Sequence, residues 1–128
     1  ITIDTGHSFY SGENIAEAVV LARRAGNLLY PMHFNANPGN WDAAMIMSTV
    51  HFTCYVELLF WLRKKGYEGW LSMDQYPYRE DAVDAISESI LWVKKYEEIV
   101  DAHYVEIDAL IKENDAVKTS RFLRKLIA

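Results

Sequence analysis

The sequence repeats one unit three times: a short apolar segment, polar residues at its end, and then a segment with helical periodicity. The apolar segments are residues 1–3, 28–32 and 69–73, and each predicts a strand. Helices are predicted over 13–25, over 41–65 and from Asp81 onward. Strands that alternate with helices are typical of parallel βαβ units, because a parallel pair needs a long crossover connection. The sequence therefore predicts an α/β fold.

The predicted helices differ in how clearly the sequence marks them. Helix 13–25 has a regular apolar face and ends at Gly26-Asn27. After Asp81, a predicted N-cap, one face is apolar at every position but one; its members are Val83, Ile86, Ile90, Val93, Glu97 and Val100. Two further helices are predicted over 104–113 and 115–126, split at Asn114-Asp115. We therefore expect the βα units over 1–103 and a helical extension over 104–128.

Composition narrows the possible functions. Half of the residues are hydrophobic (51%), which excludes a disordered chain, and the net charge of −5 offers no basic surface for nucleic acid or an anionic membrane. Cys54 is the single cysteine, which excludes a disulfide framework and favours a reducing, cytoplasmic compartment. The chain opens on Ile rather than Met, inside an apparent strand. We expect it to be the C-terminal part of a longer protein.

Residues 43–62 have the length of a membrane span and carry one charge, Glu57. Polar groups recur along the segment at almost every turn; they are Ser48, Thr49, His51 and Thr53. Lipid tolerates such groups poorly. The sequence therefore favours a helix buried in protein and no association with a membrane.

Polar residues follow each predicted strand: Asp4, His33 and Asp74. The carboxyl ends of parallel strands meet at one edge of a sheet, so we expect these side chains to converge. Two carboxylates and one imidazole suit a divalent cation, with Mn²⁺ or Co²⁺ favoured and Mg²⁺ or Zn²⁺ also compatible. In the alternative interpretation, the two aspartates are caps and His33 is an ordinary hydrogen-bonded polar residue. Three equivalent positions in three units favour the shared cation.

Other residues near this edge have both a functional and a structural interpretation. His7 is a candidate to orient a substrate hydroxyl or move a proton, or is a plain loop residue. Asp42 fits the start of the 41–65 helix, where a carboxylate suits the helix dipole. Arg79 either pairs with a nearby acid or supports the substrate. Trp41 is a candidate wall of a substrate pocket, with Phe9, Tyr10 and Phe34, although such residues are more often core.

These segments resemble the xylose isomerase-like TIM-barrel superfamily, which includes xylose and rhamnose isomerases and ketose 3-epimerases. The likeness covers about residues 1–100 and rests on Asp4-Thr5-Gly6-His7, His33-Phe34-Asn35 and the stretch from Asp74 to Asp81. It implies the last three βα units of a (β/α)8 barrel plus C-terminal helices. It also implies metal ligation by Asp4, His33 and Asp74, and contact of His7 with substrate or a second metal. A further ligand, a Glu, would lie on a strand about 30 residues before Asp4.

The resemblance implies a metal-dependent sugar isomerase that interconverts an aldose and a ketose, by hydride shift or through an enediol. An Asp at position 74 resembles the aldose–ketose isomerases, because the epimerases use Glu. Asp42 stands where one acid of a second metal site would be, but Ala44 occupies the place of the other. The alternatives are a ketose 3-epimerase and a non-catalytic partial-barrel interaction domain. Three strands cannot close a barrel, so a homo-oligomer or association with the missing N-terminal barrel part is expected.

Overall fold

The computed structural model describes all 128 residues and has a three-stranded, fully parallel sheet in the order β1-β2-β3. The strands are short: β1 is Ile3–Asp4, β2 is Met32–Phe34 and β3 is Leu71–Met73. The register pairs Asp4 with His33 and His33 with Ser72. The α/β class and the parallel pairing predicted from the sequence are confirmed. The second strand begins four residues later than expected, where Met32 and Phe34 are fully buried, and the third begins two residues later and ends at Met73 as expected.

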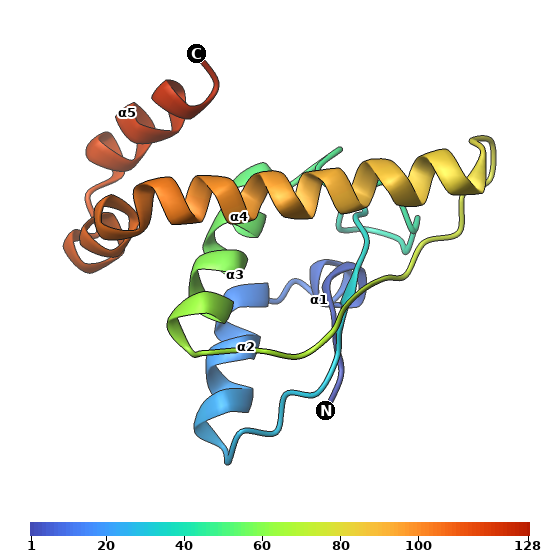
Figure 1. Cartoon of the computed structure of the whole chain (residues 1–128), viewed down its shortest axis with the longest axis horizontal. Helices are drawn as coiled ribbons and strands as arrows, with labels where there is room; N and C mark the ends of the chain where they lie inside the picture. Colours follow the sequence, from blue (N-terminus) through green and yellow to red (C-terminus); the bar gives the residue numbers. More distant parts are fainter.

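Five helices accompany the sheet: α1 (Thr5–Tyr10), α2 (Ile15–Arg24), α3 (Phe52–Lys64), α4 (Ala82–Glu113) and α5 (Ala116–Leu126). Helix α3 packs against both α2 and α4. Figure 1 shows α4 running across the whole molecule, with α5 turning back at its C-terminal end. The sequence predicted a loop after the first strand, but residues 5–10 form α1 because Asp4 caps its first turn.

The helix predicted over 41–65 begins only at Phe52. Residues Ala44, Ser48 and His51 have φ of 44°, 70° and 63°, and an α-helix cannot contain this left-handed conformation. Backbone groups in this segment instead bond elsewhere: Met45 pairs with Ala36 in an antiparallel bridge, and the Met47 amide donates to Ser89 Oγ. Met47 is thus fully buried, and Met45 and Val50 are partly buried against the core, without helix formation. No helix is long and apolar enough to cross a membrane.

Helix α4 is longer than predicted, and its buried face matches the predicted one only in part: Val93 and Val100 are buried as expected. The expected break before residue 104 is only a distortion at His103 (φ −124°, ψ 17°), since no Pro or Gly interrupts the chain there. Val83 and Ile90 are exposed, whereas the buried stripe is Ala85, Ser89, Val93, Tyr96, Val100 and Ile107. The predicted end at Asn114 is confirmed, with Asn114 in the left-handed region (φ 53°) and Asp115 capping α5.

Tyr96 is fully buried, and its hydroxyl donates to Ser48 Oγ at 2.6 Å. Burial raises the pKa of Tyr96 to about 12. The unfolded chain loses this proton near pH 10, so the free energy of unfolding should fall as the pH rises from about 10 to 12. We expect urea unfolding to show that the free energy of unfolding falls less steeply with pH in Tyr96→Phe than in the wild type. The exposed Tyr78→Phe variant should follow the wild type; identical slopes for all three proteins would contradict the prediction.

Candidate metal centre

Asp4 lies at the end of β1 and is held by nitrogen donors. Its Oδ1 accepts from the backbone amide of His7 at 2.9 Å, which caps α1. The side-chain amide of Asn35 donates to Oδ1 at 3.2 Å and to Oδ2 at 3.3 Å. The capping role considered for Asp4 is therefore confirmed. Capping leaves Oδ2 directed toward β2, so it does not exclude a second role as a ligand.

His33 lies between the two aspartates on the middle strand. Its Nδ1 is 3.0 Å from Asp74 Oδ2 and 3.8 Å from Asp4 Oδ2. Residues 4 and 33 are register partners, and Asp74 lies two residues beyond Ser72, the partner of His33 on β3. Because side chains alternate along a strand, all three point to the same face of the sheet. The structure thus brings together the three residues that the sequence predicted would converge.

The donor set fits a divalent cation. One ligand atom from each of Asp4, His33 and Asp74 lies within 4.8 Å of the others. Two atoms bound to one cation at about 2.0–2.2 Å can lie at most about 4.4 Å apart, so small side-chain rotations suffice. Two carboxylates facing one imidazole nitrogen also repel each other, and a cation between them would remove this repulsion. The oxygen-rich set with one nitrogen is compatible with Mn²⁺ or Co²⁺.

His7 and Asp42 form a second pair beside this cluster, with His7 Nε2 3.1 Å from Asp42 Oδ2. His7 Nδ1 lies 3.9 Å from Asp4 Oδ1. The predicted place of Asp42 at a helix start is wrong, because residues 41–51 are not helical, so helix-dipole stabilisation does not explain it. The pairing with His7 accounts for its position instead. A second metal at Asp42 stays a prediction.

The remaining candidates are less well placed. Trp41 is 57% exposed next to Asp42, which leaves it accessible to a ligand. The Arg79 guanidinium forms no ion pair, and only its backbone amide bonds to Glu80, so the expected pairing with an acid is wrong for the side chain. Phe34 is fully buried, and Phe9 stacks on His51 with centroids 4.0 Å apart; both belong to the core.

Asn35 was not predicted to have a role, although its side-chain amide donates to both carboxylate oxygens of Asp4. The sequence did contain a signal for this contact: Asn35 follows His33 by two residues, so both side chains lie on the same face of the sheet. Tyr55 was also missed: it is fully buried, and its hydroxyl donates to the Asn35 carbonyl at 2.6 Å. Burial raises the pKa of Tyr55 far above its ordinary value. This hydroxyl therefore remains a donor at any physiological pH.

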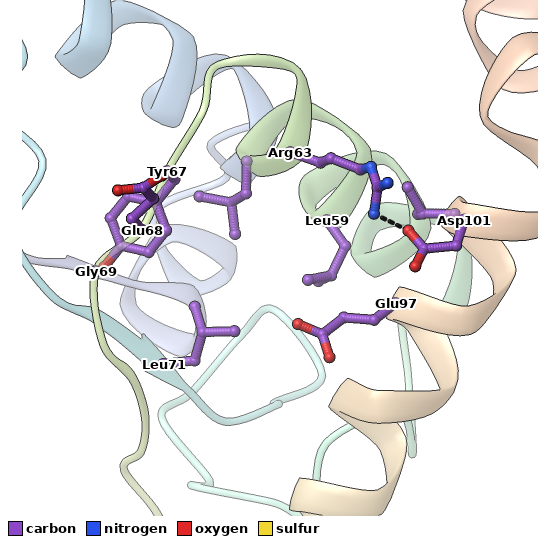
Figure 2. A pocket seen from close by; sticks show the side chains of 10 residues that line it. Leu59, Arg63, Tyr67, Glu68, Gly69, Leu71, Glu97 and Asp101 are labelled. Atoms are coloured by element: carbon purple, nitrogen blue, oxygen red, sulfur yellow. Dashed lines mark hydrogen bonds and ion pairs between the residues drawn. The ribbon is translucent and has the colours of Figure 1, made fainter.

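A cavity of the molecule lies away from these residues. Figure 2 shows this cavity of about 460 Å³ between the end of α3, the segment before β3 and the middle of α4. Leu59, Leu71 and Val100 are among its lining residues, and the Arg63–Asp101 ion pair closes one wall. The cavity lies at the amino end of β3, whereas Asp74 follows its carboxyl end. It is therefore separate from the metal-binding candidates.

Comparison with known proteins adds no assignment. No model of a known protein family matches the chain, and no curated protein matches its sequence significantly.

Proposed function

We propose that this chain carries the metal-binding edge of a sugar isomerase that interconverts an aldose and a ketose with a divalent cation, with Mn²⁺ or Co²⁺ favoured by the ligand set. The convergence of Asp4, His33 and Asp74 at the carboxyl ends of three parallel strands is the observation that carries the proposal. Open-chain sugars present neighbouring oxygens that a cation at such an edge can hold. A bound cation would polarise the sugar carbonyl and stabilise negative charge on its oxygen.

The fold proposed with this function is the end of a (β/α)8 barrel. The three strands are parallel, neighbours in sequence are neighbours in the sheet, and helices lie in both connections. The candidate ligands occupy the carboxyl edge, where barrel enzymes place their sites. Strands β1 and β3 each pair with a single neighbour, so both edges of the sheet have unpaired backbone groups. Further strands, from the rest of a barrel or from an assembly partner, would satisfy them.

Each residue has a defined part in the proposed reaction. Nδ1 of His33 faces both carboxylates, so the neutral ring must carry its proton on Nε2 to bind a cation. The Asp42 carboxylate accepts from Nε2–H of His7, which leaves Nδ1 of the neutral His7 ring as a proton acceptor beside Asp4. Nδ1 would thereby orient a sugar hydroxyl by accepting its hydrogen bond, and it would protonate a sugar oxygen only after taking up a proton itself. Trp41, exposed next to Asp42, is the proposed apolar contact for the sugar, whereas Arg79 is a weaker candidate.

The direct test is metal-dependent turnover. Because the proposed barrel needs more than these three strands, and the chain alone is expected to be inactive without them, the full-length protein would be used. It would be stripped with EDTA, reloaded with Mn²⁺ or Co²⁺, and incubated with aldopentoses, aldohexoses and 6-deoxyhexoses. We expect ketose to form only in the reloaded protein, and stripped protein to serve as the control. Formation of a C3 epimer from a ketose would instead identify the epimerase. Failure to bind either metal and to convert any sugar would contradict the proposal and favour a non-catalytic interaction domain.

A further inference from the structure

We infer that Asn35 is a positioning residue that orients the Asp4 carboxylate for the cation, and that Gly6 leaves the space in which Asn35 does so. The inference rests on the proposed function and concerns a buried residue that would act through Asp4. Asn35 is 3% exposed, and its Nδ2 donates to both Asp4 oxygens at 3.2 and 3.3 Å. With the His7 amide, these contacts fix the plane of the carboxylate and leave Oδ2 toward His33. Partners of this kind orient ligands and raise metal affinity.

The backbone of Asn35 is itself fixed. Its carbonyl accepts from the Thr5 hydroxyl at 2.7 Å and from the Tyr55 hydroxyl at 2.6 Å, and its amide donates to Thr5 Oγ1 at 3.1 Å. These contacts join the end of β2 to the first turn of α1 and to α3. The side chain of Asn35 therefore starts from a rigid backbone, so its amide can hold Asp4 in one orientation.

The orientation of the Asn35 amide depends on Asp4 alone. Its Oδ1 is buried and has no hydrogen-bond partner, so no contact of that oxygen determines the orientation. Turning the amide by 180° would place Oδ1 against the negatively charged Asp4. The Asn35 amide therefore leaves its own Oδ1 unpaired so that its N–H groups can point at the Asp4 carboxylate.

Gly6 makes this arrangement possible through its size. A Cβ at Gly6 would lie 1.7 Å from Asn35 Oδ1 and 2.8 Å from Asn35 Cγ. Gly6 lies within helix α1 and its φ is not positive, so the requirement for glycine here is space rather than conformation. Any side chain at position 6 would displace the Asn35 amide and, with it, the orientation of Asp4.

The first test measures Mn²⁺ affinity by the electron paramagnetic resonance signal of free Mn²⁺. We expect Asn35→Ala and Gly6→Ala each to weaken binding about tenfold or more. Asn35→Leu, which keeps most of the volume without the N–H donors, should weaken it equally and serves if Asn35→Ala is unstable. Asn40→Ala, in the exposed loop, is the control and should bind as the wild type does. Folded Asn35 variants with unchanged affinity would overturn the positioning role.

The second test needs no metal. In stripped protein, Gly6→Ala should lower the melting temperature by about 4 °C or more, because its methyl group overlaps the Asn35 amide. In the Asn35→Ala variant the space beside residue 6 is free, so adding Gly6→Ala should lower the melting temperature by less than about 2 °C. Equal losses in both backgrounds would overturn the inference. A wild-type protein that binds no Mn²⁺ would contradict the proposed function, and this cycle would then decide the Gly6–Asn35 relation by itself.

Discussion

Asp74→Ala is expected to weaken Mn²⁺ binding by at least about 100-fold and to reduce aldose isomerisation below detection, because it removes one of three candidate ligands. The Asp74 side chain is 57% exposed, and its only hydrogen bond is to His33. Such a surface contact contributes little to stability. The free energy of unfolding of metal-free protein should therefore change by no more than about 0.5 kcal/mol.

The matched control for Asp74→Ala is Glu80→Ala, an exposed carboxylate six residues along the chain that belongs to no candidate metal cluster. Calorimetric titration with Mn²⁺ and a ketose assay would be run on both variants and the wild type. An Asp74→Ala protein that binds Mn²⁺ and turns over substrate as the wild type does would refute the assigned ligand role. A loss of both properties in the Glu80 control would show that the effect is not specific to the cluster.

Leu58→Ala is expected to lower the free energy of unfolding by about 2–5 kcal/mol, because it leaves a cavity in the core. Leu58 is fully buried on α3, the helix that packs against both α2 and α4. Urea unfolding should show a lower midpoint with an unchanged slope. Leu91→Ala is the control: Leu91 is 57% exposed on α4, so its loss should cost about 0.5 kcal/mol or less. Equal costs for the two variants would contradict this account of the core.

The sequence predicted an element correctly where the deciding residues are neighbours in the chain, and wrongly where distant residues decide. The end of α4 and the start of α5 were predicted because Asn114 and Asp115 act on their immediate neighbours. The 41–51 segment was predicted wrongly as helix. Its apolar residues suit a buried helix, but its backbone bonds instead to Ala36, before the segment, and to Ser89, 42 positions from Met47. Such partners override local helix preference.

The same distinction applies to the candidate site. The sequence by itself predicted three parallel strands with Asp4, His33 and Asp74 at their ends, because strand–helix alternation and polar termini are local patterns. The structure places Asp4 at the end of β1 and Asp74 directly after β3, but His33 lies within β2. Only the tertiary structure revealed that Asn35 bonds to Asp4, that Gly6 makes room for it and that Asp42 faces His7. These contacts join residues about 30 positions apart. They depend on how β1, α1 and the loop after β2 pack together, which no periodicity in the sequence records.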